Sequence, residues 1–154
     1  MMQHKRGFSL LELVIVVVII GIIAAIAIPR MSRGSAGAAD SALNGNLAIL
    51  RNAIELYAAE HNGTVPVAAK IVDQLTGYTD VNGTVSPDGT KTTPYIYGPY
   101  LRKVPPLPVG STRKGDTDIA AADGAGVGWI YSESTGEIVA NSADTDINNK
   151  AYNS

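Results

Sequence analysis

The sequence contains no cysteine, so disulfide cross-links, thiolate metal sites and cysteine nucleophiles are excluded. Basic residues are also few: 12 Lys and Arg stand against 14 Asp and Glu, which gives a net charge of −2. Beyond the N-terminus the basic residues form no cluster, and a clustered basic surface is the usual electrostatic signature of nucleic-acid binding. Nucleic acid is therefore not an expected partner.

Catalytic motifs are missing as well. Neither G-x-S-x-G nor H-E-x-x-H occurs, and of the two histidines only His61 lies beyond the first few residues. The pattern Gly124-x-Gly126-x-Gly128 opens no expected helix, so it indicates a flexible turn rather than a phosphate-binding loop. We therefore expect a protein that is not an enzyme.

What the sequence does contain is a long apolar run near its start. From Phe8 to Ile28, every residue except Ser9, Glu12 and Gly21 is apolar. As a helix the run would be about 31 Å long at ~1.5 Å per residue, which matches the hydrocarbon core of a membrane. Two basic residues precede it, and the positive-inside tendency predicts a cytoplasmic N-terminus and an exported C-terminal part.

Glu12 is the unusual residue in this run. A charge inside a bilayer costs roughly 2.5–3.5 kcal/mol even on the lenient insertion scale, so a plain membrane anchor does not explain it. A secretory signal cleaved near residues 25–27 is a second interpretation, but the uninterrupted apolar stretch from Leu13 to Ile28 exceeds the usual length of a signal core. Cleavage between Gly7 and Phe8 would instead place a new ammonium one helical turn before Glu12, available to a neighbouring copy.

The residues G-F-S-L-L-E-L from Gly7 to Leu13, followed by the apolar run, resemble the prepilin motif of type IV pilins and type II secretion pseudopilins. The resemblance implies that a membrane-embedded prepilin peptidase cleaves between Gly7 and Phe8 and methylates the amine of Phe8. It also implies that Glu12 pairs with the Phe8 amine of an adjacent subunit as a filament of identical copies grows.

Pro29 follows the apolar run, and a proline inside a helix removes one hydrogen-bond donor, so we expect a kink or a break there. Gly21 loosens the same span, and the resemblance implies that the segment between Gly21 and Pro29 can lose helical structure when subunits pack into a filament. Beyond Arg30, an apolar stripe at spacings of three and four predicts an amphipathic helix that packs on a head domain and ends near His61. The stripe consists of Leu43, Leu47, Leu50, Ile54 and Tyr57.

The sequence after Asn62 is rich in glycine, proline and polar turn residues, which indicates one compact head. It predicts a short helix at 67–75, a hairpin turn with positive φ at both Asn82 and Gly83, and a tyrosine-rich segment at 94–101 that packs on the long helix. Residues 128–131 and 137–140 are the clearest strand pair.

The expected fold is α+β and type IV pilin-like: a long N-terminal helix, half membrane-embedded and half amphipathic, packs against a small antiparallel sheet. The expected parts are a leader at 1–7, a membrane-embedded helix at 8–29, an amphipathic helix at 30–62 and a periplasmic head at 63–154.

The segment from Tyr100 to Pro108 and the Trp-containing strand pair also resemble the major pseudopilin of type II secretion, although Leu107 stands where that family usually has an aspartate. This resemblance implies that a C-terminal loop holds calcium, against the alternative of solvated acidic loops. The candidate ligands are Asp144, Asp146 and Asn148, or else Asp116, Asp118 and Asp123. Type IV pilins commonly close a C-terminal loop with a disulfide, which this chain cannot form.

The favoured interpretation is a structural subunit of a type II secretion pseudopilus, held in the bacterial inner membrane and assembled into a filament that drives protein export. Its expected partners are further copies of itself, the prepilin peptidase, an inner-membrane assembly platform and minor pseudopilins. The alternative within the same class is a type IV pilin for adhesion, motility or DNA uptake. A membrane-anchored periplasmic binding or enzymatic domain is a third interpretation, and it would require Glu12 to be dispensable.

Overall fold

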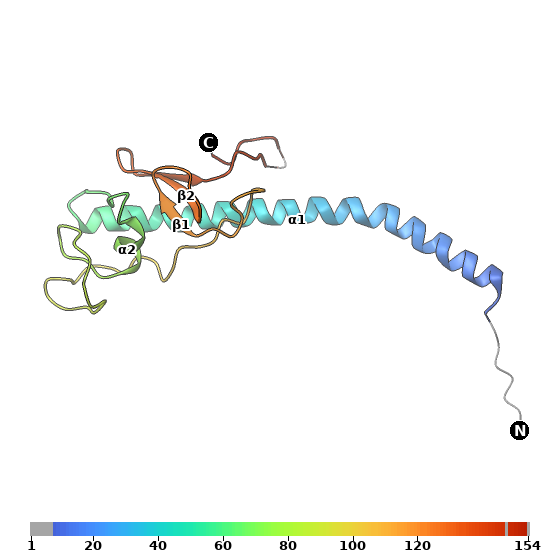
Figure 1. The fold of residues 1–154 in the computed structure, drawn as a ribbon, viewed down its shortest axis with the longest axis horizontal. Helices are drawn as coiled ribbons and strands as arrows, with labels where there is room; N and C mark the ends of the chain where they lie inside the picture. The colour runs from blue at the N-terminus through green and yellow to red at the C-terminus, as the bar shows by residue number, and fades with distance from the viewer. Residues whose placement is uncertain (1–7, 147, 154) are drawn as a thin grey trace, which may run out of the picture. The chain divides into compact units, whose positions relative to one another are not determined.

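The computed structural model describes residues 8–146 and 148–153 of the 154-residue chain. The chain divides into two compact units, the N-terminal unit Met1–Ala36 and the head unit Gly37–Ser154, which are described separately. The elements in chain order are α1 (Leu10–Glu60), α2 (Ile71–Thr76), β1 (Asp118–Ala120), β2 (Val127–Ser132) and β3 (Glu137–Ala140) (Figure 1). A long N-terminal helix followed by a small sheet confirms the predicted α+β class.

The described part of the N-terminal unit is almost entirely helical. Helix α1 continues without interruption through Gly21 and Pro29, so the single chain has no helix break at either residue. A proline inside a helix removes one backbone hydrogen bond, but the residues on both sides of Pro29 remain helical. Loss of helical structure between Gly21 and Pro29 in a filament stays a prediction.

The core of the head unit is built on one face of α1. All five residues of the predicted stripe are buried, with Leu50 fully enclosed and the others no more than 8 % exposed. The partners of the stripe come from the sheet, where Trp129, Tyr131 and Ile138 are at most 1 % exposed. Residues of α2 and of the 101–109 loop complete the same core, and burying a large apolar side chain stabilises a fold by about 1.5–3 kcal/mol.

The sheet has three strands in the order β1-β2-β3. Strands β2 and β3 pair antiparallel, with Trp129 opposite Ala140, which confirms the predicted hairpin. Strand β1 instead runs parallel to β2, so the sheet is mixed and the prediction of a wholly antiparallel sheet was wrong. Gly128 explains the close approach, because a Cβ at this position would collide with the backbone of Asp116 just before β1.

Two local predictions need correction. Helix α2 begins at Ile71 rather than near Val67, and residues 67–70 form a turn in which the Lys70 N–H donates to the carbonyl of Val67 (2.8 Å). In the 80–84 turn Gly83 has φ of +78°, but Asn82 does not have the predicted positive φ. The carboxylate of Asp80 organises this turn by accepting hydrogen bonds from two backbone N–H groups, those of Asn82 (2.9 Å) and Thr84 (2.8 Å).

The end of α1 and the tyrosine-rich segment follow the predictions. Gly63 takes the left-handed conformation (φ +82°), and its N–H caps the helix at the carbonyl of Ala58 (2.8 Å). From the 94–101 segment, the ring of Tyr100 packs edge-on against Tyr57 of α1, with centroids 5.6 Å apart. This contact fastens the loop-rich half of the head to the helix end.

Candidate assembly site and the predicted metal clusters

The first turn of α1 is closed by Ser9 and Glu12. The Ser9 hydroxyl accepts a hydrogen bond from the N–H of Leu11 (3.3 Å), and Glu12 Oε2 accepts one from the N–H of Ser9 (2.8 Å). Helices begin with several N–H groups that have no partner inside the helix, and a serine followed three residues later by glutamate supplies acceptors for them. Glu12 therefore caps the helix of its own chain.

This capping role is a function of Glu12 that the sequence reasoning missed. The signal was present, because the order Ser9-x-x-Glu12 before an apolar run is the known pattern of a capping box. The glutamate thus has an intrachain reason to be there in addition to the predicted interchain one. Of the two residues at the predicted cleavage point, Gly7 lies outside the described residues, while Phe8 is described and 80 % exposed.

The surface of α1 in the N-terminal unit is apolar and exposed. Fourteen large apolar side chains between Phe8 and Ile26 are each 47–80 % exposed. At roughly 80 Å² per side chain they present on the order of 1,000 Å², whereas soluble monomers rarely expose an apolar patch above about 300–600 Å². Such a surface needs a non-aqueous environment or a protein partner.

The membrane-embedded helix predicted at residues 8–29 was compared with the length and hydropathy that a membrane span requires. Within the residues that the structure describes, no helix meets the combined length and hydropathy expected of a membrane span.

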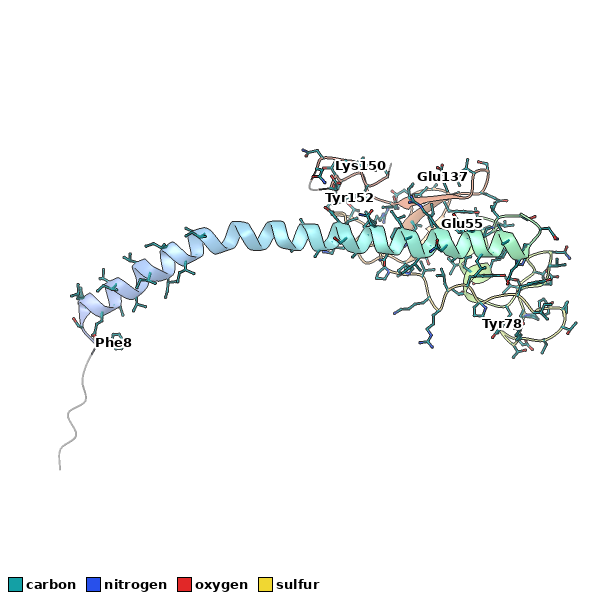
Figure 2. All side chains as sticks on the ribbon, turned by 180° about the vertical axis from the view of Figure 1, so that it is seen from behind. Phe8, Glu55, Tyr78, Glu137, Lys150 and Tyr152 are labelled. Carbon is teal, nitrogen blue, oxygen red and sulfur yellow. The ribbon has the colours of Figure 1, made fainter. Side chains whose placement is uncertain are left out.

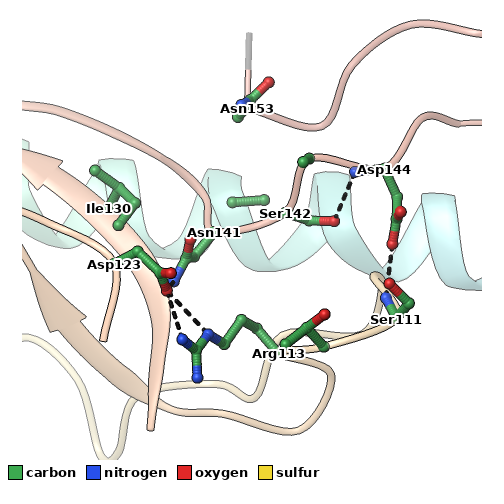
Figure 3. Close-up of a pocket in the computed structure, with 11 residues that line it drawn as sticks. Ser111, Arg113, Asp123, Ile130, Asn141, Ser142, Asp144 and Asn153 are labelled. Carbon is green, nitrogen blue, oxygen red and sulfur yellow. Dashed lines mark hydrogen bonds and ion pairs between the residues drawn. The ribbon is translucent and has the colours of Figure 1, made fainter. Parts of the chain in front are cut away.

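Asp123 and Asp144, from the two predicted calcium clusters, line one pocket of about 290 Å³ (Figure 3). Asp123 forms an ion pair with Arg113 (2.9 Å) and accepts a hydrogen bond from the side chain of Asn141 (2.8 Å). The bond from Asn141, helped by the guanidinium of Arg113, holds the pKa of Asp123 below its usual range. Asp144 Oδ2 instead accepts a hydrogen bond from the backbone N–H of Ser111 (2.6 Å).

Asp116 and Asp118 form backbone hydrogen bonds: the Asp116 carbonyl accepts from the N–H of Leu107 (2.9 Å), and the Asp118 N–H donates to the carbonyl of Gly126 (3.0 Å). Asp146 Oδ1 accepts hydrogen bonds from the backbone N–H groups of Asn148 and Lys150, both at 2.8 Å, and the bond from Lys150 is the main cause of its lowered pKa. In this turn Asn148 contributes a backbone N–H. In the described part of the chain, no three acidic or histidine side chains gather closely enough to hold a metal ion. The residues as arranged do not fit calcium, and binding of calcium stays an untested prediction.

His61, the one histidine available to an enzyme mechanism, is enclosed in the head. It is 2 % exposed, and its ring stacks on that of Tyr57 with centroids 3.8 Å apart. Nδ1 lies 2.7 Å from the carbonyl oxygen of Tyr57, and Nε2 lies 3.0 Å from both Thr79 Oγ1 and the carbonyl oxygen of Asp80. Both ring nitrogens are thus engaged within the head, and the ring links Thr79 and Asp80 to the end of α1.

Comparison with known proteins bears on the N-terminal segment alone. Residues 2–28 match the family described as the prokaryotic N-terminal methylation motif. No curated protein and no solved structure matches the chain. The matched motif supports a type IV pilin-like protein with a structural role, and it is common to the subunits of pili and of pseudopili.

Proposed function

We propose that this chain is the subunit of a type II secretion pseudopilus, a filament assembled from the bacterial inner membrane to drive protein export. One observation carries the proposal: the methylation motif at residues 2–28 coincides with the helix surface whose apolar side chains are left exposed. A filament core supplies the partner that this surface needs, and a membrane supplies its environment before assembly.

In the proposed sequence of events, the precursor is held in the inner membrane with residues 1–7 in the cytoplasm and the head in the periplasm. Prepilin peptidase cleaves between Gly7 and Phe8 and methylates the new amine of Phe8. Glu12 then exchanges its intrachain hydrogen bond for an ion pair with the Phe8 ammonium of an adjacent copy. An assembly platform and minor pseudopilins are the further partners in this proposal.

Two sequence features favour a secretion pseudopilus over a surface pilus. The segment from Tyr100 to Pro108 resembles that of the major pseudopilin, and in the structure its residues Leu101, Val104 and Leu107 are buried against the core. The chain also has no cysteine for the C-terminal disulfide common in type IV pilins. A type IV pilin for adhesion, motility or DNA uptake is the second candidate.

The test is mass spectrometry of the N-terminal peptide from protein purified out of native membranes. We expect a chain that begins at Phe8 and carries one added methyl group. A chain that begins after Ala27, or one that keeps its leader when prepilin peptidase is present, would overturn the proposal. Deletion of the gene should then abolish export of secreted enzymes while leaving surface pili intact; the reverse result would assign the chain to a pilus.

A further inference from the structure

The C-terminal segment of the head is fastened to α1 by a side chain 112 residues away in sequence. The Tyr152 hydroxyl donates a hydrogen bond to Asp40 Oδ1 (2.6 Å). The Tyr152 ring is partly buried against the core, and Figure 2 shows Tyr152 and Lys150 beside the helix. Burial, together with the bond to Asp40, raises the pKa of Tyr152 to about 12, so the hydroxyl keeps its proton at physiological pH.

A second fastening joins the same segment to the loop at 110–111. Asp144 Oδ2 accepts a hydrogen bond from the Ser111 N–H (2.6 Å), and the Asp144 N–H donates to Ser142 Oγ (3.1 Å). Gly110 has φ of +91°, and a Cβ there would lie only 2.8 Å from Ser142 Oγ. A glycine at this position therefore lets the loop approach the segment closely.

Between these two fastenings the segment is closed by its own backbone. Thr145 and Ala151 form an antiparallel bridge, and the N–H of Asp146 donates to the carbonyl of Lys150 (2.8 Å). The N–H of Tyr152 donates to the carbonyl of Asp144 (3.1 Å), which connects the two fastening residues directly. Protein donors thus occupy carboxylate oxygens that a calcium site would need.

We propose that Tyr152–Asp40 and Asp144–Ser111 form a clasp that holds residues 142–146 and 148–153 against the head without a disulfide or a divalent cation, and that this clasp opens while the core stays folded. The clasp is separable because its hydrogen bonds are exposed or only partly buried, whereas Trp129 of β2 and Leu50 of α1 are fully enclosed. Opening uncovers Leu43 and Leu47, which line a small cavity beneath Tyr152. The inference concerns the head alone and holds for either kind of filament.

The test of the clasp is amide hydrogen exchange, which is measured by NMR on the full chain in detergent micelles. Tyr152→Phe removes only the hydroxyl, and Asp144→Ala removes the second acceptor. Tyr78→Phe is the matched control, because the Tyr78 hydroxyl forms no hydrogen bond with the described residues. Since a hydrogen bond to a charged group is among the stronger ones, we expect exchange at the amides of Asp146 and Tyr152 to rise about tenfold or more in either variant. The amides of β2 and the control variant should not change.

Each alternative result would overturn the inference. If exchange at Asp146 and Tyr152 slows when calcium is added and rises with a chelator, a cation closes the segment. If Tyr152→Phe behaves like Tyr78→Phe, the hydroxyl fastens nothing. If the amides of β2 exchange faster together with the C-terminal ones, the segment is part of the core and does not open separately.

Discussion

Replacing Glu12 by two different residues separates its capping role from its proposed pairing role. Glu12→Gln keeps an oxygen that can accept the Ser9 N–H but removes the charge, whereas Glu12→Ala removes both. The interaction of the carboxylate with the helix N-terminus is worth about 0.3–1 kcal/mol. Breaking a buried ion pair by removing one partner costs about 3–5 kcal/mol, because the Phe8 ammonium of the neighbour is left unpaired.

The two variants should therefore assemble equally poorly while their helix ends behave differently. A loss of about 3–5 kcal/mol lowers the equilibrium constant of each subunit contact by between about a hundredfold and several thousandfold. Filaments would be counted by electron microscopy in cells, and exchange at the Ser9 amide would be measured by NMR on the uncleaved chain. We expect filaments from the wild type but from neither Glu12 variant, and faster Ser9 exchange in Glu12→Ala but not in Glu12→Gln.

Ser9→Ala is the matched control, because it weakens the cap and keeps the charge. It should still form filaments, with mass spectrometry confirming that all variants are cleaved. Filaments from Glu12→Gln at the wild-type level, with none from Glu12→Ala, would show that Glu12 acts only as a helix cap. Filaments from both would refute any role of Glu12 in assembly.

Three further predictions concern the head. Trp129→Ala should lower the free energy of unfolding by about 3–5 kcal/mol in urea titrations, since the fully buried indole leaves a cavity, and an unchanged midpoint would contradict the packing. Gly45→Ala should raise stability by up to about 1 kcal/mol in the same assay, because a Cβ there meets nothing within 4 Å, and destabilisation would mean that the site is crowded. The pKa of Asp123 is lowered by its bonds to Asn141 and Arg113, so its contribution is present above the unfolded value of about 3.9 and is lost as the pH falls through the folded value. Asp123→Asn should therefore flatten the loss of thermal stability below about pH 4, and an unchanged slope would refute the assignment.

Hydrophobic patterning made the main elements of this protein predictable. The stripe from Leu43 to Tyr57 repeats at the period of a helix, and the alternation around Trp129 repeats at that of a strand, so each predicts which face is buried. Both faces meet in the core as predicted. The termination of α1 before Gly63 was also predictable, because a glycine adopts positive φ at little cost.

Other features depended on contacts between residues distant in sequence. Strand β1 runs parallel to β2 where the backbone of Asp116 lies close to Gly128, and the Val67 N–H before α2 bonds the side chain of Gln74. The partners of the acidic candidate ligands are also distant in sequence or unmarked by any local pattern: Arg113 pairs with Asp123, and the Ser111 N–H binds Asp144. Whether either predicted cluster binds calcium stays a prediction.

The sequence by itself determined the apolar N-terminal run with its methylation motif, the buried stripe of the long helix and the strand pair, because local periodicity and local motifs specify them. Tertiary structure alone decided that β1 is parallel, that His61 is enclosed, and that Tyr152 reaches Asp40 across 112 positions. These outcomes depend on contacts between residues that are distant in sequence, and such contacts form only when the core packs. A local sequence pattern does not specify them.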